Sequence, residues 1–181
     1  MPPSSGTGSS SCGESEMGER KPLRLKEWNY STPGYYFVTI CTQEKRKLFP
    51  VGAAPCGRLD LAGDLAERWL EKLPKKFPEV LLDKYVIMPN HVHCILRILP
   101  PEEAGGHMGP PLQRVVEWYK TMSTNEWIRM VKEGKLPPFE KHLWQRSYYD
   151  HIIRDESDYL RIWQYIDANP AKWAEDCYYI P

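Results

Sequence analysis

His91 and His93 are separated by one residue within an apolar, β-branched run, and their spacing could support metal chemistry. Side chains two residues apart in a strand point to the same face of a sheet. Two imidazoles on one face supply two of the ligands that a metal site needs, and a third ligand must come from elsewhere in the chain. The alternative is a pair of histidines at the edge of the core that hydrogen-bond to backbone or water.

A phenol and a carboxamide, Tyr165 and Asn169, are four residues apart near the C-terminus. Apolar residues recur at helical spacing through residues 155–168, and residues four apart are neighbours on one flank of a helix. The two polar groups could therefore converge on one point. Each also has a structural explanation, because Tyr165 could be a half-buried packing residue, and an asparagine before Pro170 is an ordinary helix stop.

The elements that must position these groups follow from the apolar pattern. Aromatic and β-branched runs predict four strands, at residues 35–42, 80–88, 91–99 and 144–153. Amphipathic periodicity predicts three helices, at residues 61–73, 112–131 and 155–168. Pro74 is expected to end the first helix, Asp155 is a suitable N-cap for the last, and Pro89 and Asn90 predict a tight turn between two strands.

This order of elements predicts an α+β fold with a ferredoxin-like β-α-β-β-α-β sheet and one appended C-terminal helix, which carries Tyr165. The 181 residues are enough for one domain with its own core. Residues 1–22 are rich in Ser, Gly and Pro and predict a disordered leader. We therefore expect a single folded domain over residues 23–181.

Composition excludes several classes of protein. No apolar run approaches the length that spans a bilayer, and the N-terminus lacks the apolar core of a signal peptide. The five cysteines are odd in number and lack Cys-x-x-Cys spacing, which argues against a disulfide framework and a cysteine zinc cluster and indicates a reducing cytosol. The formal net charge of +0 weighs against a strongly basic nucleic-acid binder, although short basic clusters leave room for a local patch.

Weaker candidates lie in the segment 144–153. Trp144, Tyr148 and Tyr149 could stack on exposed bases, but aromatic residues on a strand are more often part of a core. His151 is expected to make a structural hydrogen bond rather than to bind a metal.

The motif around His91 and His93 resembles the His-hydrophobic-His motif of the single-tyrosine transposases that mobilise small insertion sequences. The segments WQRSYYDHIIR (residues 144–154) and YIDANP (residues 165–170) resemble the REP-associated branch of that superfamily more closely. These are bacterial transposases linked to repeated extragenic palindromes. The early strand YFVTI is also similar, and the likeness extends over residues 23–173.

This resemblance implies a metal-dependent enzyme that nicks and rejoins single-stranded DNA near hairpins. His91 and His93 match the family's metal-binding pair, and Tyr165 matches its nucleophile. Asn169 occupies the position of a third polar ligand, where insertion-sequence relatives often have Gln. The implied cofactor is a divalent ion, Mg²⁺ or Mn²⁺, and the implied intermediate is a covalent 5′-phosphotyrosine with a free 3′-hydroxyl.

The implied partner is single-stranded or hairpin DNA in a bacterial cytoplasm, without a membrane, and the resemblance leaves both a monomer and a homodimer open. Two other functions also remain open. One is a domesticated relative that binds DNA hairpins without cleaving them, which retention of every motif residue disfavours. The other is a zinc-dependent hydrolase of small substrates, whose His-x-His motif usually has an acidic ligand nearby, and residues 94–99 offer none.

Overall fold

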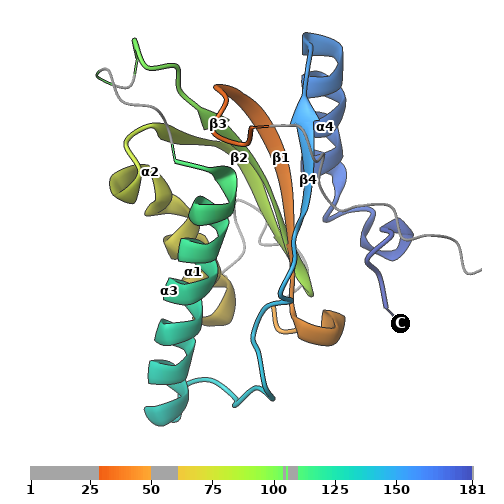
Figure 1. Cartoon of the computed structure of the whole chain (residues 1–181). Coiled ribbons are helices and arrows are strands. Elements are labelled where there is room, and N and C mark those ends of the chain that lie inside the picture. The colour runs from red at the N-terminus through yellow and green to blue at the C-terminus, as the bar shows by residue number, and fades with distance from the viewer. Residues whose placement is uncertain (1–28, 50–60, 104, 106–109, 181) are drawn as a thin grey trace, which may run out of the picture.

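The predicted apolar runs form four antiparallel strands: β1 (Gly34–Cys41), β2 (Val80–Met88), β3 (His91–Ile98) and β4 (Tyr149–Ile153). The computed structural model describes residues 29–49, 61–103, 105 and 110–180, so the predicted leader lies outside the described residues. The strands form one sheet in the order β2-β3-β1-β4 (Figure 1). This is the predicted ferredoxin-like α+β sheet, with β1 and β3 at its centre.

Helices cover both faces of this sheet. The helices α1 (Leu61–Glu71), α2 (Leu73–Lys76) and α3 (Leu112–Lys132) lie on one side, and α4 (Glu156–Ala168) lies on the other (Figure 1). Two short 3-10 helices, η1 (Gln43–Lys45) and η2 (Trp173–Glu175), follow β1 and α4. Within the described part of the chain, no helix combines the length and apolar character needed to cross a bilayer.

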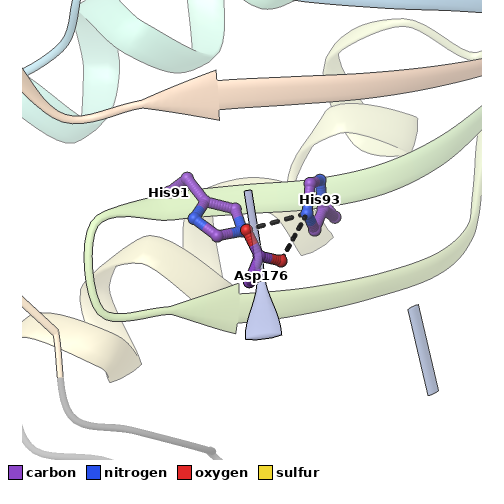
Figure 2. Close-up of side chains that lie close together, drawn as sticks. All are labelled: His91, His93 and Asp176. Carbon is purple, nitrogen blue, oxygen red and sulfur yellow. Dashed lines mark hydrogen bonds and ion pairs between the residues drawn. The ribbon is translucent and has the colours of Figure 1, made fainter. Parts of the chain in front are cut away.

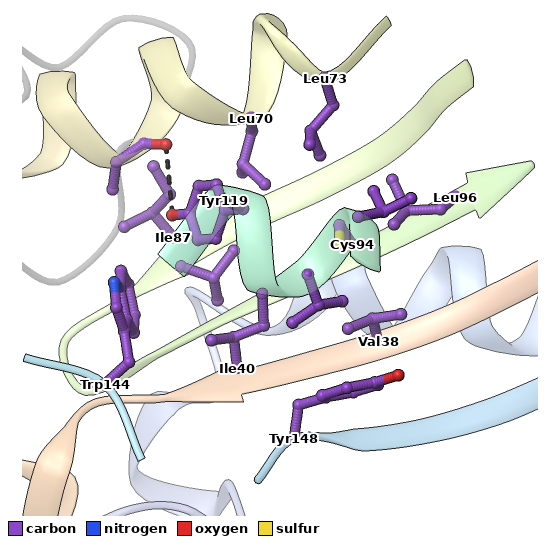
Figure 3. Packing of buried hydrophobic residues seen from close by; sticks show 14 of the residues in the cluster. Val38, Ile40, Leu70, Leu73, Ile87, Cys94, Leu96, Tyr119, Trp144 and Tyr148 are labelled. Carbon is purple, nitrogen blue, oxygen red and sulfur yellow. Dashed lines mark hydrogen bonds between the residues drawn. The ribbon is translucent and has the colours of Figure 1, made fainter. Parts of the chain in front are cut away.

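The larger part of the core lies between the sheet and α1–α3. Alternate residues of the central strands, such as Val38, Ile40 and Cys94, point toward Leu70 of α1 and Tyr119 of α3 (Figure 3). Burying an apolar side chain of this size contributes about 1.5–3 kcal/mol. Because side chains alternate along a strand, the intervening residues of β1 and β3 point to the opposite face, toward α4.

A smaller cluster lies on that opposite face, where Ile162 and Ile166 of α4 pack on Met88 and Ile95. The predicted N-cap of α4 is confirmed, since the Asp155 side chain accepts a hydrogen bond from the backbone N–H of Asp158. This cap and the apolar stripe fix the helix across the central strands, and both faces of β3 are therefore covered.

Two predicted boundaries were wrong. The first helix ends at Glu71, and Pro74 lies in the first turn of the separate helix α2, where a residue without an N–H donor is tolerated. The last strand begins at Tyr149 instead of residue 144, and Trp144 makes only an isolated bridge with Thr42.

The segment before β4 leaves the sheet because α3 holds it. The indole N–H of Trp144 donates to Ser123 Oγ at 2.9 Å. The ammonium of Lys120 donates to the carbonyls of residues 145, 146 and 147 at 2.9, 3.3 and 2.9 Å. Packing and charge-assisted hydrogen bonds with α3 therefore override the strand propensity of this aromatic segment.

Candidate active site

The two histidines lie side by side on the face of β3 that α4 covers. His91 is 0% exposed and His93 is 1% exposed. Their Nε2 atoms are 2.9 Å apart, as expected for residues of one strand that share a face (Figure 2). Two polar rings are thus fully buried in a largely apolar strand, with the same nitrogen of each ring directed to one point.

Hydrogen bonds on the far side of each ring set this orientation. His91 Nδ1 lies 2.8 Å from Asn90 Oδ1, and the Asn90 amide nitrogen donates to the carbonyl of Tyr178 at 2.8 Å. His93 Nδ1 lies 2.8 Å from the Oγ1 of Thr39, its partner across the β1–β3 pairing. An amide oxygen only accepts, so His91 Nδ1 donates and its Nε2 carries a lone pair. Metal-binding histidines are commonly oriented by such a hydrogen bond to the other ring nitrogen.

The electrostatic environment keeps both imidazoles neutral. Burial lowers the pKa of His91 to about 3, with a further contribution from the neighbouring His93. Burial also lowers the pKa of His93, although Asp176 acts in the opposite direction. A neutral imidazole is the form that binds metal ions.

A carboxylate from the C-terminal segment, Asp176, meets the histidines from the side of α4. Its Oδ2 is 4.0 Å from His93 Nε2, and its Oδ1 accepts from the backbone N–H of Tyr178 at 2.6 Å (Figure 2). Burial alone would raise the pKa of Asp176, but the nearby His93 imidazole and hydrogen bonds from Tyr178 and Asn169 lower it well below its usual range. The group is therefore a carboxylate at neutral pH.

Tyr165 and Asn169 converge on the same carboxylate oxygen. The Tyr165 hydroxyl donates to Asp176 Oδ2 at 3.0 Å and lies 3.3 Å from His93 Nε2, while the Asn169 amide donates to Asp176 Oδ2 at 2.8 Å. Asn169 retains helical dihedrals although Pro170 follows, which keeps its side chain one turn after Tyr165. The predicted neighbours on one flank of the helix thus meet at one point.

The ionisation of the tyrosine is disfavoured in this arrangement. Burial and then the charge of Asp176 raise the pKa of the Tyr165 phenol. The side chain is nevertheless 39% exposed, so its hydroxyl lies at the boundary between the buried histidines and solvent. A ligand arriving from solvent can therefore reach the phenol without displacing α4.

The donor atoms of this cluster suit a divalent cation. Ligand atoms of His91, His93 and Asp176 all lie within 4.8 Å of one another. Asn169 is 3% exposed, and its Oδ1 is buried without a hydrogen-bond partner among the described residues. Two imidazole nitrogens, a carboxylate and a carboxamide oxygen are ligands that divalent metals accept.

The structure therefore brings together the four side chains that the sequence indicated, His91, His93, Tyr165 and Asn169. The weaker candidates are not among these four converging side chains, although His151 lines a hollow beside Tyr165. His151 makes the expected structural contact, with Nε2 2.7 Å from Asp158 Oδ2. Trp144 and Tyr148 are core residues, whereas Tyr149 is 47% exposed.

Three residues of the site were missed in the sequence. Asp176 follows Glu175 in the segment beyond α4, and no period links it to Tyr165. Thr39 is distant in sequence and meets His93 only through the pairing of β1 with β3. Asn90 was predicted only as part of the tight turn between two strands, and no role in the site was assigned to it. A signal was available for Asn90, since a polar side chain next to a buried histidine is an obvious hydrogen-bond partner.

Comparison with known proteins adds three findings. Residues 62–169 match the sequence profile of the family described as "Transposase IS200 like". An uncharacterised protein of Haemophilus influenzae is 38% identical over 170 residues, covering 89% of this chain and 93% of that protein. A candidate REP-associated tyrosine transposase of the same organism is 24% identical, covering 80% of this chain and 74% of that protein.

A similar fold occurs in a solved structure of a REP-associated tyrosine transposase bound to a REP hairpin. The TM-score is 0.54 at 20% sequence identity, and the alignment covers 83% of this chain and 73% of the other. At this sequence identity the likeness concerns the fold.

Proposed function

Because the chain belongs to the IS200-like transposase family, we propose that it nicks and rejoins single-stranded DNA beside a hairpin, using Tyr165 as the nucleophile. One observation carries this proposal: the Tyr165 hydroxyl lies 3.3 Å from Nε2 of His93, beside a buried pair of histidines. A nucleophile next to groups of metal-ligand type is an arrangement that suits phosphodiester transfer.

The proposed substrate class follows from the family and from the fold. A protein of the same fold has been solved with a REP hairpin bound, which supports hairpin DNA with a single-stranded flank as the substrate. The chain carries no overall basic excess, so local contacts must provide its DNA affinity. One chain supplies both the histidines and the tyrosine, which supports a site that is complete in a monomer.

The proposed metal ligands are His91, His93 and Asp176. A divalent ion held there, Mg²⁺ or Mn²⁺, would supply positive charge that offsets the charge developing on the phosphate oxygens and lowers the cost of ionising the phenol. Asn169 stays a predicted ligand. Its side-chain nitrogen already donates a hydrogen bond to Asp176, and its buried Oδ1 is the atom that would bind the metal ion.

In the proposed reaction the Tyr165 oxygen attacks the phosphorus, and the bond from phosphorus to the 3′-oxygen breaks. The products are a 5′-phosphotyrosine and a free 3′-hydroxyl, which takes up a proton. The phenol proton has an acceptor in place, because Asp176 Oδ2 already accepts the Tyr165 hydrogen bond. Rejoining is the reverse displacement by a 3′-hydroxyl, and it needs no ATP because the phosphodiester energy is kept in the covalent link.

The direct test is covalent capture of DNA. Purified protein is incubated with Mn²⁺ or Mg²⁺ and labelled hairpins with single-stranded flanks, taken from inverted repeats next to the gene, and is resolved on a denaturing gel. We expect an adduct with the wild-type chain and none with Tyr165→Phe. Tyr159→Phe is the matched control, since Tyr159 lies on the same helix and its hydroxyl bonds Asp83 instead of the site.

The same experiment separates the competing functions. An adduct that survives Tyr165→Phe contradicts the assigned nucleophile. Metal-independent hairpin binding without an adduct would identify a non-catalytic binder of DNA hairpins. Stoichiometric zinc in the purified protein together with no DNA affinity would identify a zinc-dependent hydrolase of small substrates.

A further inference from the structure

Two hollows meet at the proposed nucleophile. The first, of about 540 Å³, lies along the exposed side of α4 and reaches the C-terminal segment. The second, of about 380 Å³, lies between α4 and the face of the sheet that carries the histidines. Tyr165 and Arg161 line both hollows. The phenol that would attack phosphorus is therefore accessible from two adjoining spaces.

The two hollows differ in the side chains that line them. The smaller one is lined by aromatic rings, including Phe37 and Tyr178, and Phe37 lies 5.1 Å from the ring of His93 and 6.1 Å from that of Tyr165. Both rings are partly exposed, and aromatic rings that solvent can reach stack on unpaired bases. The larger hollow is lined by Gln164 and by charged groups of both signs, Arg161 and Lys172 together with Glu175 and Asp176. The amide and the two cations can bind a sugar-phosphate.

Arg161 is positioned to bind a phosphate at the boundary between them. It lies four residues before Tyr165 and so on the same flank of α4. Its Nη2 bonds Asp158, whose other carboxylate oxygen is 2.7 Å from Nε2 of His151 on β4. This contact directs the guanidinium and uses one of its nitrogens. Within the described part of the chain, its other donors are available to a phosphate oxygen.

We propose that the two hollows hold the two nucleotides on either side of the scissile phosphate. The smaller hollow takes the unstacked base of one nucleotide, and the larger takes the sugar-phosphate of the other. Arg161 binds the phosphate adjacent to the scissile one. The volumes agree with this, since sites for ligands of this size span about 300–1,000 Å³. The inference rests on the proposed function and adds the path of the strand across Tyr165.

The test is a double-mutant cycle between Arg161 and the DNA. Adduct formation is timed in single turnovers with wild-type and Arg161→Ala protein, on DNA with an uncharged methylphosphonate at each phosphate near the cleavage point in turn. We expect Arg161→Ala, and one flanking methylphosphonate, each to slow the wild-type reaction about tenfold. That methylphosphonate should cause no further slowing in Arg161→Ala, because the interaction is already absent.

The control is Arg129→Ala, since Arg129 is also an exposed helical arginine bonded to an acid three residues earlier, Glu126. It should react at the wild-type rate, and Arg161→Lys should recover part of the loss. If the rate losses from Arg161→Ala and from the methylphosphonate multiply at every phosphate position, Arg161 does not bind any of these phosphates. The assignment of Tyr165 as the nucleophile would not be affected. No adduct from wild-type protein on any hairpin would instead contradict the proposed function, and this inference with it.

A second variant tests the base subsite. Phe37→Leu should weaken binding of the intact single strand several-fold, and should have no effect when the flanking nucleotide is abasic. A melting curve shows whether the variant is folded. Equal loss on intact and abasic strands would exclude base stacking in the smaller hollow.

Discussion

The hydroxyl of Tyr165 donates to the carboxylate of Asp176 at 3.0 Å, although the two residues come from different elements, the helix α4 and the segment after η2. The same carboxylate oxygen accepts from Asn169 and lies 4.0 Å from His93. Asp176 therefore links the phenol to the histidine pair, and it is the residue whose replacement should be most informative.

Asp176→Asn should reduce the affinity for Mn²⁺ by at least about tenfold, because a charged oxygen ligand is replaced by a neutral one. It should also lower the pKa of the Tyr165 phenol toward its ordinary value, since the charge of Asp176 contributes to raising it. Calorimetric titration with Mn²⁺ measures the first effect, and ultraviolet titration of the phenols measures the second.

The matched control for this prediction is Asp167→Asn. Asp167 lies on α4 and pairs with Lys84 at 2.6 Å, away from the histidines, so Mn²⁺ affinity should not change. Equal Mn²⁺ affinities for the wild-type chain and Asp176→Asn would remove Asp176 from the ligand set.

Thr39→Val should weaken metal binding by about 10–100-fold, because His93 loses the hydrogen bond that orients its ring. Thr39→Ser keeps the hydroxyl and should restore most of the affinity. The two variants are compared by titration with Mn²⁺, with the free energy of unfolding measured alongside. If the serine variant binds as weakly as the valine variant, the hydrogen bond is not what sets the affinity.

Acidification should destabilise the metal-free protein between about pH 6.5 and pH 3. The pKa of His91 falls from 6.5 to about 3 on folding, so the unfolded chain binds more protons as the pH drops below 6.5 and stability is lost. At about pH 5 this single group should cost about 2 kcal/mol. The lowered pKa of Asp176 acts in the same direction but only below about pH 4.

Urea unfolding in the presence of a chelator, at several pH values, measures this dependence. His91→Gln should show a flatter profile over the same interval, because the titrating group is gone. A wild-type stability that is constant from about pH 7 to pH 5 would mean that His91 is not held neutral by burial.

Lys120→Ala should lower the free energy of unfolding by about 1–3 kcal/mol, because three backbone carbonyls of residues 145–147 lose a charged donor. Lys132→Ala, at the exposed end of the same helix, should change stability by less than about 0.5 kcal/mol. Mn²⁺ affinity should be unaltered in both. A loss of metal affinity in Lys120→Ala alone would indicate that the segment before β4 supports the site.

Local periodicity was sufficient to predict most of the helices and strands and the pairing of the site residues within each element. The spacing of His91 and His93 predicted a shared strand face, and the spacing of Tyr165 and Asn169 predicted a shared helix flank, because both depend only on the repeat of one element. The ferredoxin-like order of elements and the predicted transposase family are confirmed for the same reason, since strand and helix patterns and short motifs are properties of contiguous sequence.

Tertiary structure decided what depends on distant segments. The aromatic run at residues 144–148 has the propensity of a strand, but buried contacts with α3 draw it away from the sheet. Thr39 joins the site through strand pairing, and Asp176 through the turn that brings the chain back after α4. Such contacts have no sequence period, because they arise when separate elements pack together. The sequence by itself therefore determined which reactive side chains were available, and only packing decided that the carboxylate of Asp176 would meet them.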